Sequence, residues 1–244
     1  MNQGLFTIKE NTQLVPYIYR MRLTGDTTAF TAPGQFLNIR LDGMYLRRPI
    51  SLCDLEGDTM TIIYKVVGHG TEAMAGMKPG TQLDILTGLG NGYDLTEGTK
   101  PILLGGGVGV PPMYYLAQKL IEKGCDVTAV LGFNKKEEVF YEDEFKALGA
   151  KTIVTTADGS YGVKGFVTDA MKTIDYDYFY ACGPEPMLRA VFKASETSGQ
   201  MSFEKRMGCG FGACMGCSCK TITGYKRICK EGPVMRKEEI LWED

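Results

Sequence analysis

Histidine is nearly absent from this chain of 244 residues, in which His69 is the only one. A catalytic triad based on histidine could use only His69, and a metal site with several histidine ligands is excluded. An excess of charge of one sign is also lacking, because 27 lysines and arginines nearly balance 29 aspartates and glutamates. With no long basic run either, nucleic acid is not an expected partner.

Long apolar runs are missing as well. No apolar stretch approaches the ~20 residues that a membrane-spanning helix requires. Residues 1–5 show neither the basic start nor the apolar core of a signal peptide. We therefore expect a cytoplasmic protein without a membrane partner. The length predicts two compact units plus a small appendage.

Cysteine, by contrast, is concentrated near the C-terminus. Cys209, Cys214 and Cys217 form a C-x4-C-x2-C pattern, and Cys229 follows after eleven further residues. This is the spacing of a plant-type [2Fe–2S] loop, in which four thiolates hold two irons. Glycines let a tight loop bring its backbone N–H groups close to an anionic cluster, and this loop contains Gly208, Gly210, Gly212 and Gly216.

Two other interpretations of these cysteines are a structural zinc site and disulfides. Zinc sites usually combine two short Cys pairs, whereas only Cys214 and Cys217 form such a pair here. Disulfides are typical of secreted proteins, and the absence of a signal-peptide pattern in residues 1–5 argues against that class. A Rieske centre needs two histidines and is excluded. Cys219 lies close by, but the x2 spacing favours Cys217 as the ligand.

The rest of the chain predicts two larger units. Residues 1–98 contain short alternating segments separated by turns, as in a small antiparallel β-barrel; the clearest lie at 14–23, 35–41, 59–67 and 82–87. Residues 99–200 alternate strands and helices, which predicts an α/β domain with a parallel sheet. Helices are expected there at 111–123, 137–148, 167–173 and 186–198. Residues 201–244 form a small Cys-rich iron–sulfur subdomain.

Three short motifs in these units could contact a nucleotide cofactor. The Arg-Pro-Ile-Ser run at 48–51 could clamp a pyrophosphate with its guanidinium. The glycine-rich run at 105–109 joins a strand to a helix, where a pyrophosphate can approach the backbone. The Cys-Gly-Pro run at 182–184 follows a strand at the edge where α/β sheets bind ligands. Each motif alone also suits a purely structural role.

In this order, the motifs resemble those of the ferredoxin–NADP reductase family, in which an FAD-binding barrel precedes a nicotinamide-binding domain. The R-x-x-S, G-x-G-x-x-P and C-G-P motifs of that family fit residues 48–51, 107–112 and 182–184. The cysteine loop and the Lys-Glu-Gly-Pro-Val run at 230–234 point to one subgroup of this family. Over essentially its whole length the chain resembles the electron-transfer subunits of type B dihydroorotate dehydrogenases.

This resemblance implies an oxidoreductase subunit that uses FAD, a [2Fe–2S] cluster and NAD. A catalytic subunit with FMN would oxidise dihydroorotate in pyrimidine biosynthesis, and its electrons would pass through the cluster and FAD to NAD+. The order suits the chemistry, because a flavin exchanges two electrons with a nicotinamide and single electrons with a cluster. Two such chains and two catalytic subunits would form a heterotetramer.

Carried over residue by residue, the resemblance implies cofactor contacts but no catalytic acid or base. The cluster ligands would be Cys209, Cys214, Cys217 and Cys229. FAD would be held by Arg48, Pro49, Ile50 and Ser51, with Tyr64, Lys65 and Val66 along the flavin and Gly70 and Thr71 at its pyrophosphate. The nicotinamide nucleotide would be received by Gly107, Gly109, Cys182 and Gly183.

Two questions stay open in the sequence. NAD and NADP are distinguished just after the second strand of such a domain. The resemblance implies NAD there, whereas Lys135 and Lys136 could suit a 2′-phosphate. The same cofactors would also serve a reductase subunit with another partner, linked to a ferredoxin or a hydrogenase. A zinc site would instead make the chain a binding or regulatory module.

Overall fold

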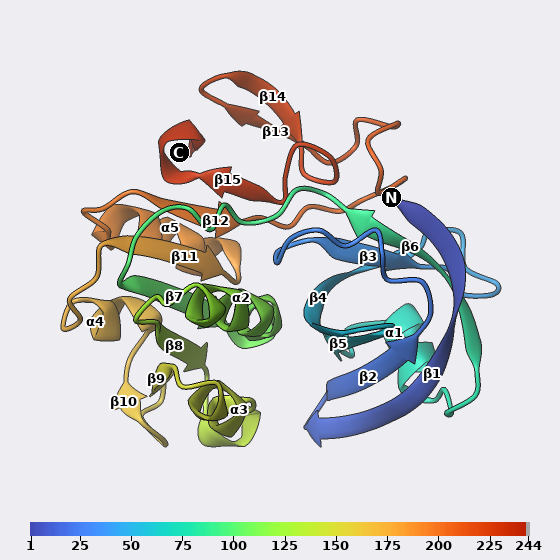
Figure 1. The fold of residues 1–244 in the computed structure, drawn as a ribbon, viewed down its shortest axis with the longest axis horizontal. Helices are drawn as coiled ribbons and strands as arrows, with labels where there is room; N and C mark the ends of the chain where they lie inside the picture. Colours follow the sequence, from blue (N-terminus) through green and yellow to red (C-terminus); the bar gives the residue numbers. More distant parts are fainter. Residues whose placement is uncertain (243–244) are drawn as a thin grey trace.

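The N-terminal part of the computed structural model, which describes residues 1–242, is a closed six-stranded barrel. The strands follow one another in the order β1-β2-β5-β4-β3-β6, all antiparallel (Figure 1). Its elements are β1 (Asn2–Val15), β2 (Ile18–Thr24), β3 (Phe36–Ile39), β4 (Arg48–Glu56), β5 (Thr59–Lys65), α1 (His69–Ala75) and β6 (Gln82–Leu89). The predicted barrel is confirmed. The last two residues of the predicted iron–sulfur subdomain lie outside the described residues.

One predicted strand of the barrel, at 14–23, is wrong in its position. The chain turns at Pro16 and Tyr17, and Tyr17 has a positive φ of 66°. Proline cannot donate to a sheet ladder, so β1 ends at Val15 and β2 begins at Ile18 as the second arm of a hairpin. The residues before position 14 extend β1 back to Asn2 because they pair with β6.

The second part contains a seven-stranded sheet in the order β10-β9-β8-β7-β11-β12-β15. It is parallel from β10 to β12, which confirms the α/β prediction, and β15 is antiparallel to β12. Its elements are β7 (Pro101–Gly106), α2 (Val110–Glu122), β8 (Thr128–Phe133), α3 (Glu142–Ala147), β9 (Lys151–Thr156), β10 (Val163–Lys164), α4 (Val167–Met171), β11 (Tyr178–Cys182), α5 (Glu185–Ala194), β12 (Gly199–Ser202) and β15 (Val234–Arg236). Short 3-10 turns occupy Gly107–Gly109, Lys136–Glu138 and Lys237–Glu239.

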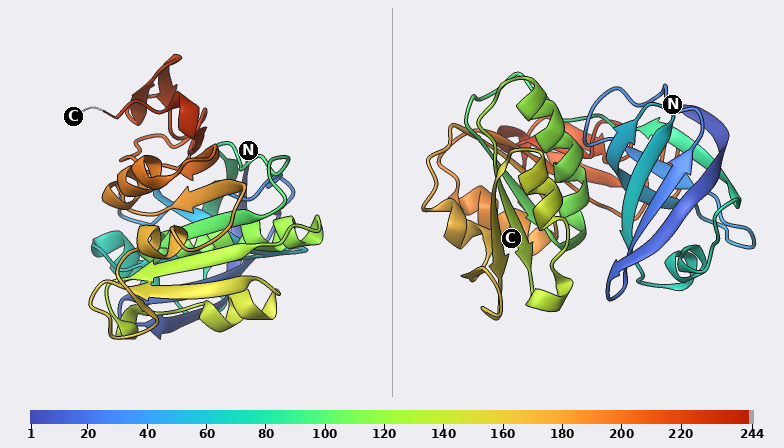
Figure 2. Two further views of the ribbon diagram at one scale, coloured as in Figure 1. Left: turned by 90° about the vertical axis from the view of Figure 1, so that its left-hand side faces the viewer. Right: turned by 60° about the horizontal axis from the view of Figure 1, so that its bottom comes forward.

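Helices cover both faces of this sheet (Figure 2). Leu103 packs with α2 and α3 on one face, whereas its neighbour Ile102 packs with α4 and α5 on the other. The helix expected at 137–148 is wrong in its first half. Tyr141 takes a left-handed conformation with φ 68°, so α3 starts only at Glu142.

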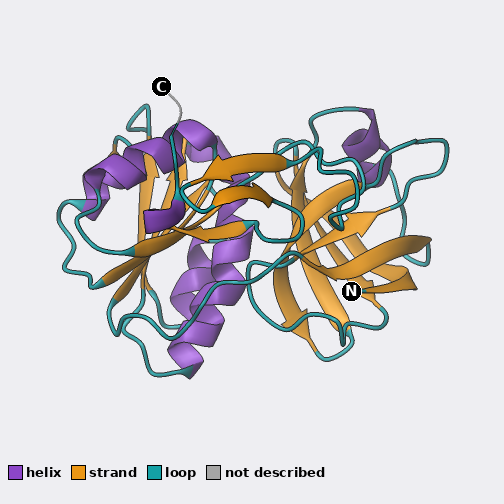
Figure 3. Ribbon diagram, turned by 90° about the horizontal axis from the view of Figure 1, so that it is seen from above, coloured by secondary structure: helices purple, strands orange, loops and turns teal. Residues whose placement is uncertain are grey.

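The cysteine segment lies across the ends of both larger parts (Figures 1 and 3). Its strand β15 extends the α/β sheet, while β13 (Ser218–Thr221) and β14 (Gly224–Arg227) form a separate hairpin. Asn91, just after β6, donates from Nδ2 to the carbonyls of Glu231 and Val234 at 3.2 and 2.8 Å. The segment is therefore fastened to both parts. Within residues 1–242, none of the helices combines the length and apolar character needed to cross a membrane.

Candidate cofactor sites

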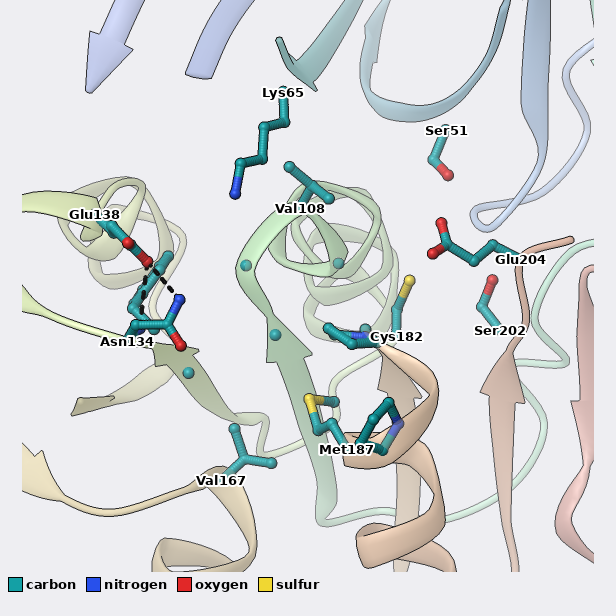
Figure 4. A pocket seen from close by; sticks show the side chains of 18 of the residues that line it. Ser51, Lys65, Val108, Asn134, Glu138, Val167, Cys182, Met187, Ser202 and Glu204 are labelled. Atoms are coloured by element: carbon teal, nitrogen blue, oxygen red, sulfur yellow. Dashed lines mark hydrogen bonds between the residues drawn. The ribbon is translucent and has the colours of Figure 1, made fainter. Parts of the chain in front are cut away.

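A cavity of about 780 Å³ lies between the barrel and the carboxyl ends of the parallel strands (Figure 4). Open α/β sheets bind ligands at this edge, and the volume is in the range of small-molecule sites. The structure brings eight of the thirteen predicted FAD and nicotinamide contacts together in its lining. These residues are Pro49, Ile50, Ser51, Lys65, Gly107, Gly109, Cys182 and Gly183.

Arg48 and Gly70 also lie together, next to Pro49 of the cavity wall. A Cβ atom on Gly70 would stand 2.1 Å from Arg48 Nε, so the guanidinium rests against the start of α1. Arg48 bonds to a backbone carbonyl and a thioether but, among residues 1–242, to no carboxylate. An arginine in this state keeps its charge available for an anion such as a pyrophosphate. Thr71 sits one residue further along α1, where its hydroxyl accepts the backbone N–H of Val67 at 2.9 Å.

Tyr64 and Val66 are placed differently from the other predicted flavin contacts. Tyr64 is buried in the barrel, where its hydroxyl donates to Asn11 Oδ1 at 3.0 Å and its ring stacks on Tyr19. Val66 borders a separate groove together with Tyr17 and Tyr19. Neither Tyr64 nor Val66 lines the cavity, and their contact with a flavin stays a prediction.

The turn after β7 requires glycine for two different reasons. Gly107 has a positive φ of 53° and open space around its Cβ position, which leaves its backbone accessible to a ligand. A Cβ atom on Gly109 would lie 2.1 Å from the carbonyl oxygen of Cys182, because this turn packs directly on the end of β11. α2 follows at once with Pro111 and Pro112 in its first turn, where a missing N–H costs little. Such a turn suits a dinucleotide pyrophosphate at the helix start.

Polar side chains gather at the end of the cavity near the barrel. Figure 4 shows Ser51 of β4, Cys182 of β11, and Ser202 and Glu204 around β12 close to one another. Burial raises the pKa of the Cys182 thiol to about 12, against a smaller opposite influence of the Ser202 hydroxyl. The thiol therefore stays protonated at neutral pH. Ser202 and Glu204 were not among the predicted contacts, although their place at the carboxyl end of a parallel strand is where such a sheet binds ligands.

Asn134 and Glu138 form the wall of the cavity just after β8. Glu138 Oε2 accepts hydrogen bonds from the backbone N–H and the Nδ2 of Asn134, at 3.3 and 2.9 Å (Figure 4). A carboxylate after the second strand suits the ribose 2′-hydroxyl of NAD and repels a 2′-phosphate. Lys135 lines the cavity, whereas Lys136 Nζ lies over the ring of Tyr161 at 5.8 Å. This arrangement favours NAD.

The four cysteines of the loop are arranged as two pairs. Cys209 Sγ accepts the backbone N–H groups of Ala213 and Cys214 at 3.2 and 3.4 Å, and Cys214 Sγ accepts that of Cys209 at 3.5 Å. Cys217 Sγ accepts the N–H of Cys229 at 3.4 Å. Within residues 1–242, no three histidine, cysteine, aspartate or glutamate side chains lie close enough together to hold one metal ion. Two pairs of thiols fit the two irons of a [2Fe–2S] cluster better than one zinc ion, which needs all four.

The loop favours the thiolate form at its first cysteine. Burial raises the pKa of the Cys209 thiol, but hydrogen bonds to its sulfur outweigh this effect and bring the pKa down to about 6. The donors are the backbone N–H groups of Phe211, Cys214 and Ala213 and the Cys214 thiol. The thiolate is the form that binds a metal. Burial raises the pKa of Cys219, which packs behind the loop with apolar residues.

An arginine on the hairpin closes the loop from the other side. Arg227 donates from one terminal nitrogen to the Gly212 carbonyl at 2.5 Å and from Nε to Glu231 Oε2 at 2.9 Å. Its second terminal nitrogen also pairs with the Glu231 carboxylate. A guanidinium in this position holds the cysteine loop against the segment that carries Cys229.

Two family models match parts of the chain. The iron–sulfur cluster binding domain of dihydroorotate dehydrogenase B matches residues 204–241, which contain all four paired cysteines. The oxidoreductase NAD-binding domain matches residues 103–193. These matches cover the segments that form the cysteine loop and most of the α/β side of the cavity.

Curated relatives and a solved structure extend the likeness to the whole chain. A protein of Fusobacterium nucleatum named dihydroorotate dehydrogenase B (NAD(+)), electron transfer subunit, is 45% identical over 96% of both chains. A protein of Shouchella clausii with the same name is 43% identical over 98% of both chains. A chain from the structure of an NADH-dependent reduced ferredoxin–NADP oxidoreductase superposes with a TM-score of 0.89 at 30% identity, covering 98% of this chain and 90% of that one.

Proposed function

Because this chain belongs to the family of electron-transfer subunits of dihydroorotate dehydrogenase B, we propose that it relays electrons from an FMN-containing catalytic subunit to NAD+ in pyrimidine biosynthesis. The observation that carries this proposal is that the nucleotide cavity and the cysteine loop both contact the barrel strand β3. When bound, FAD exchanges a hydride with a nicotinamide and single electrons with an iron–sulfur cluster. The chain itself binds, orients and insulates these groups.

The proposed roles of individual residues follow their positions. Arg48, Gly70 and Thr71 would hold the FAD pyrophosphate, and Ser51 and Lys65 would line the flavin. Gly107, Gly109, Cys182 and Gly183 would receive the nicotinamide nucleotide, with Glu138 at its ribose. The protonated Cys182 thiol can donate a hydrogen bond without adding negative charge beside a negatively charged cofactor.

We propose that the catalytic subunit docks at the cysteine loop. Cys214 is exposed, and the adjacent Phe211 and Met215 are 45% and 53% exposed. Exposed large apolar side chains on one short loop often mark a protein interface. Cys217 and Cys229 are buried on the opposite side, toward the barrel. The proposed assembly contains two of these chains and two catalytic subunits, in the cytoplasm.

The first experiment is a visible spectrum of the anaerobically purified chain, with iron, sulfide, zinc and FAD quantified. We expect two irons, two sulfides and one FAD per chain. Addition of the catalytic subunit and dihydroorotate should then reduce NAD+. A zinc-containing protein without flavin would overturn the redox function and leave a structural or regulatory module.

A second candidate function is that of a reductase subunit with a different partner. The observation in its favour is the likeness to a chain of an NADH-dependent reduced ferredoxin–NADP oxidoreductase, at 30% identity. Reduction of a ferredoxin by NADH through the isolated chain, together with no dihydroorotate-dependent NAD+ reduction when the catalytic subunit is present, would favour this second function.

A further inference from the structure

The outer face of strand β3 contacts both candidate cofactor sites. Side chains alternate along a strand, so Leu37 and Ile39 point into the barrel core, whereas Phe36 and Asn38 point outward. The strand pairs with β4, so that Phe36 lies opposite Ser51 and Asn38 lies opposite Pro49. This outer face therefore runs alongside the predicted flavin contacts.

Phe36 is shared between the cavity and the cysteine loop. Its side chain is 3% exposed and lines the cavity. It also belongs to the apolar cluster that contains Cys217 and Cys229. Within the described residues it is the one fully buried member of this cluster that lines the cavity, although the partly buried Phe203 and Met207 border it as well.

Asn38 fixes the other end of the cysteine loop. It is 1% exposed, and its Nδ2 donates a long hydrogen bond of 3.4 Å to the carbonyl of Cys209. The contact is close, because a Cβ atom on Gly210 would lie 2.3 Å from Asn38 Nδ2. The backbone carbonyl of Asn38 in turn accepts a hydrogen bond from Arg47, just before the Arg-Pro-Ile-Ser run.

We propose that the outer face of β3 is the bridge through which the cluster and the flavin exchange electrons. Phe36 packs between the nucleotide cavity and the cysteine loop, and Asn38 sets the position of that loop; both are positioning residues. This inference rests on the proposed function. Each transfer oxidises the cluster by one electron and reduces the flavin by one. Two transfers and one proton from solvent make up the hydride that NAD+ accepts.

The rate of electron transfer through this bridge should depend on how tightly its atoms are packed. Electron tunnelling slows exponentially as donor and acceptor separate, and it slows further across a void than across packed atoms. Truncating a buried phenylalanine leaves such a void because the surrounding structure relaxes only partly. The electron-transfer rate should therefore depend on Phe36 even where the two reduction potentials do not change.

The test uses the full chain loaded with FAD and cluster and reduced by NADH in a stopped-flow instrument. In Phe36→Ala, cluster reduction after flavin reduction should slow by on the order of ten-fold, because of the void. Phe36→Leu should slow it less. In both Phe36 variants, cluster reduction should slow more than the preceding flavin reduction by NADH, and the two midpoint potentials are measured to separate a change in driving force from a change in packing. The visible circular dichroism of FAD should change as a readout independent of turnover.

Leu89→Ala is the matched control. Leu89 is buried in the same cluster and lies opposite Phe36 in β6, but it does not line the cavity. The Leu89→Ala variant should have a lower free energy of unfolding but an unchanged rate of electron transfer from the flavin to the cluster. For Asn38, the Asn38→Ala variant should release iron to a chelator several-fold faster than Leu89→Ala does.

The following results would overturn the inference. Equal slowing in Leu89→Ala and Phe36→Ala would show a general loss of packing, and unchanged transfer in both Phe36 variants would show another path. Loss of both cofactors from Phe36→Leu would make Phe36 a folding residue only. Absence of FAD and cluster from the unmodified chain is a different result, which would contradict the proposed function itself.

Discussion

Single residues limit how the cysteine loop can be built, and Gly210 is the clearest case. It has a positive φ of 79°, and a Cβ atom there would meet the amide of the buried Asn38. Backbone conformation and space both exclude a side chain at this position. Gly43 offers a contrast, since it has φ 72° but nothing within 4 Å of its Cβ position.

Gly210→Ala is therefore expected to cost more than Gly43→Ala. The left-handed conformation alone costs roughly 1–2 kcal/mol for a residue with a side chain, and only Gly210→Ala adds a clash. We expect Gly210→Ala to lower both the free energy of unfolding and the iron content. Denaturant unfolding and iron analysis of the two variants check this. Equal losses in both would show that the contact with Asn38 is unimportant.

The choice between Cys217 and Cys219 is a second matter of single residues. Cys217 is 3% exposed and accepts the N–H of Cys229, whereas Cys219 lies on β13 outside both thiol pairs. Cys219→Ser should keep two irons per chain, and Cys217→Ser should lose the cluster, as measured by iron analysis and visible absorbance. The opposite pattern would show that Cys219 is the ligand.

Among the elements of the barrel, an ion pair between Arg47 and Asp84 joins segments that are far apart in the sequence. Arg47, before β4, donates to both carboxylate oxygens of Asp84 on β6, and Gln3 of β1 donates to the same carboxylate. The Arg47 guanidinium is the main cause that lowers the pKa of the Asp84 carboxyl. Folding therefore favours the ionised carboxylate.

Asp84→Asn should lower the free energy of unfolding at neutral pH by about 1 kcal/mol, because the pair is partly exposed. A depressed folded-state pKa stabilises above the unfolded-state pKa, and this stability is lost as the pH falls through the folded-state pKa. The difference between the two proteins should thus shrink below about pH 4. Denaturant unfolding at pH 7, 5 and 3.5 measures it. A difference that does not depend on pH would exclude the charge as its source.

Some elements of the fold could be predicted from the sequence, and others could not. The cysteine spacing, the short alternating segments of residues 1–98 and the strand–helix alternation of residues 99–200 are local patterns, and they predicted the thiol set, the barrel and the parallel sheet in turn. Pro16 is a local signal for the break after β1, which the predicted strand at 14–23 did not take into account. Tyr141 adopts a positive φ without being glycine, so the late start of α3 had no such signal. Phe36 and Cys229 belong to the same apolar cluster only because the tertiary fold brings their segments together. A contact between such distant segments has no spacing that a single sequence reveals.

At the scale of the whole molecule, the cavity has walls from both larger parts. A ligand that binds only the folded form stabilises it by about 2.7 kcal/mol at a free concentration of roughly 100 Kd. FAD added to the cofactor-free chain should therefore raise one common melting transition. Differential scanning calorimetry with and without FAD tests this. Two transitions, of which FAD shifts only one, would show that the cofactor contacts a single part.

The position of β15 at the edge of the sheet affects how the protein folds during its synthesis on the ribosome. Strand β12 pairs on one side with β11 and on the other with β15, and β15 is synthesised later than β12 because it lies further along the chain. Until that strand emerges, the outer side of β12 has unpaired backbone groups, which is the kind of edge that joins to other chains. Domains fold in the order of synthesis, so a nascent chain stalled before residue 234 would carry a folded barrel and a sheet with an open edge. Synthesis of residues 229–236 thus supplies Cys229 to the cysteine loop and then the strand that covers the edge of the sheet.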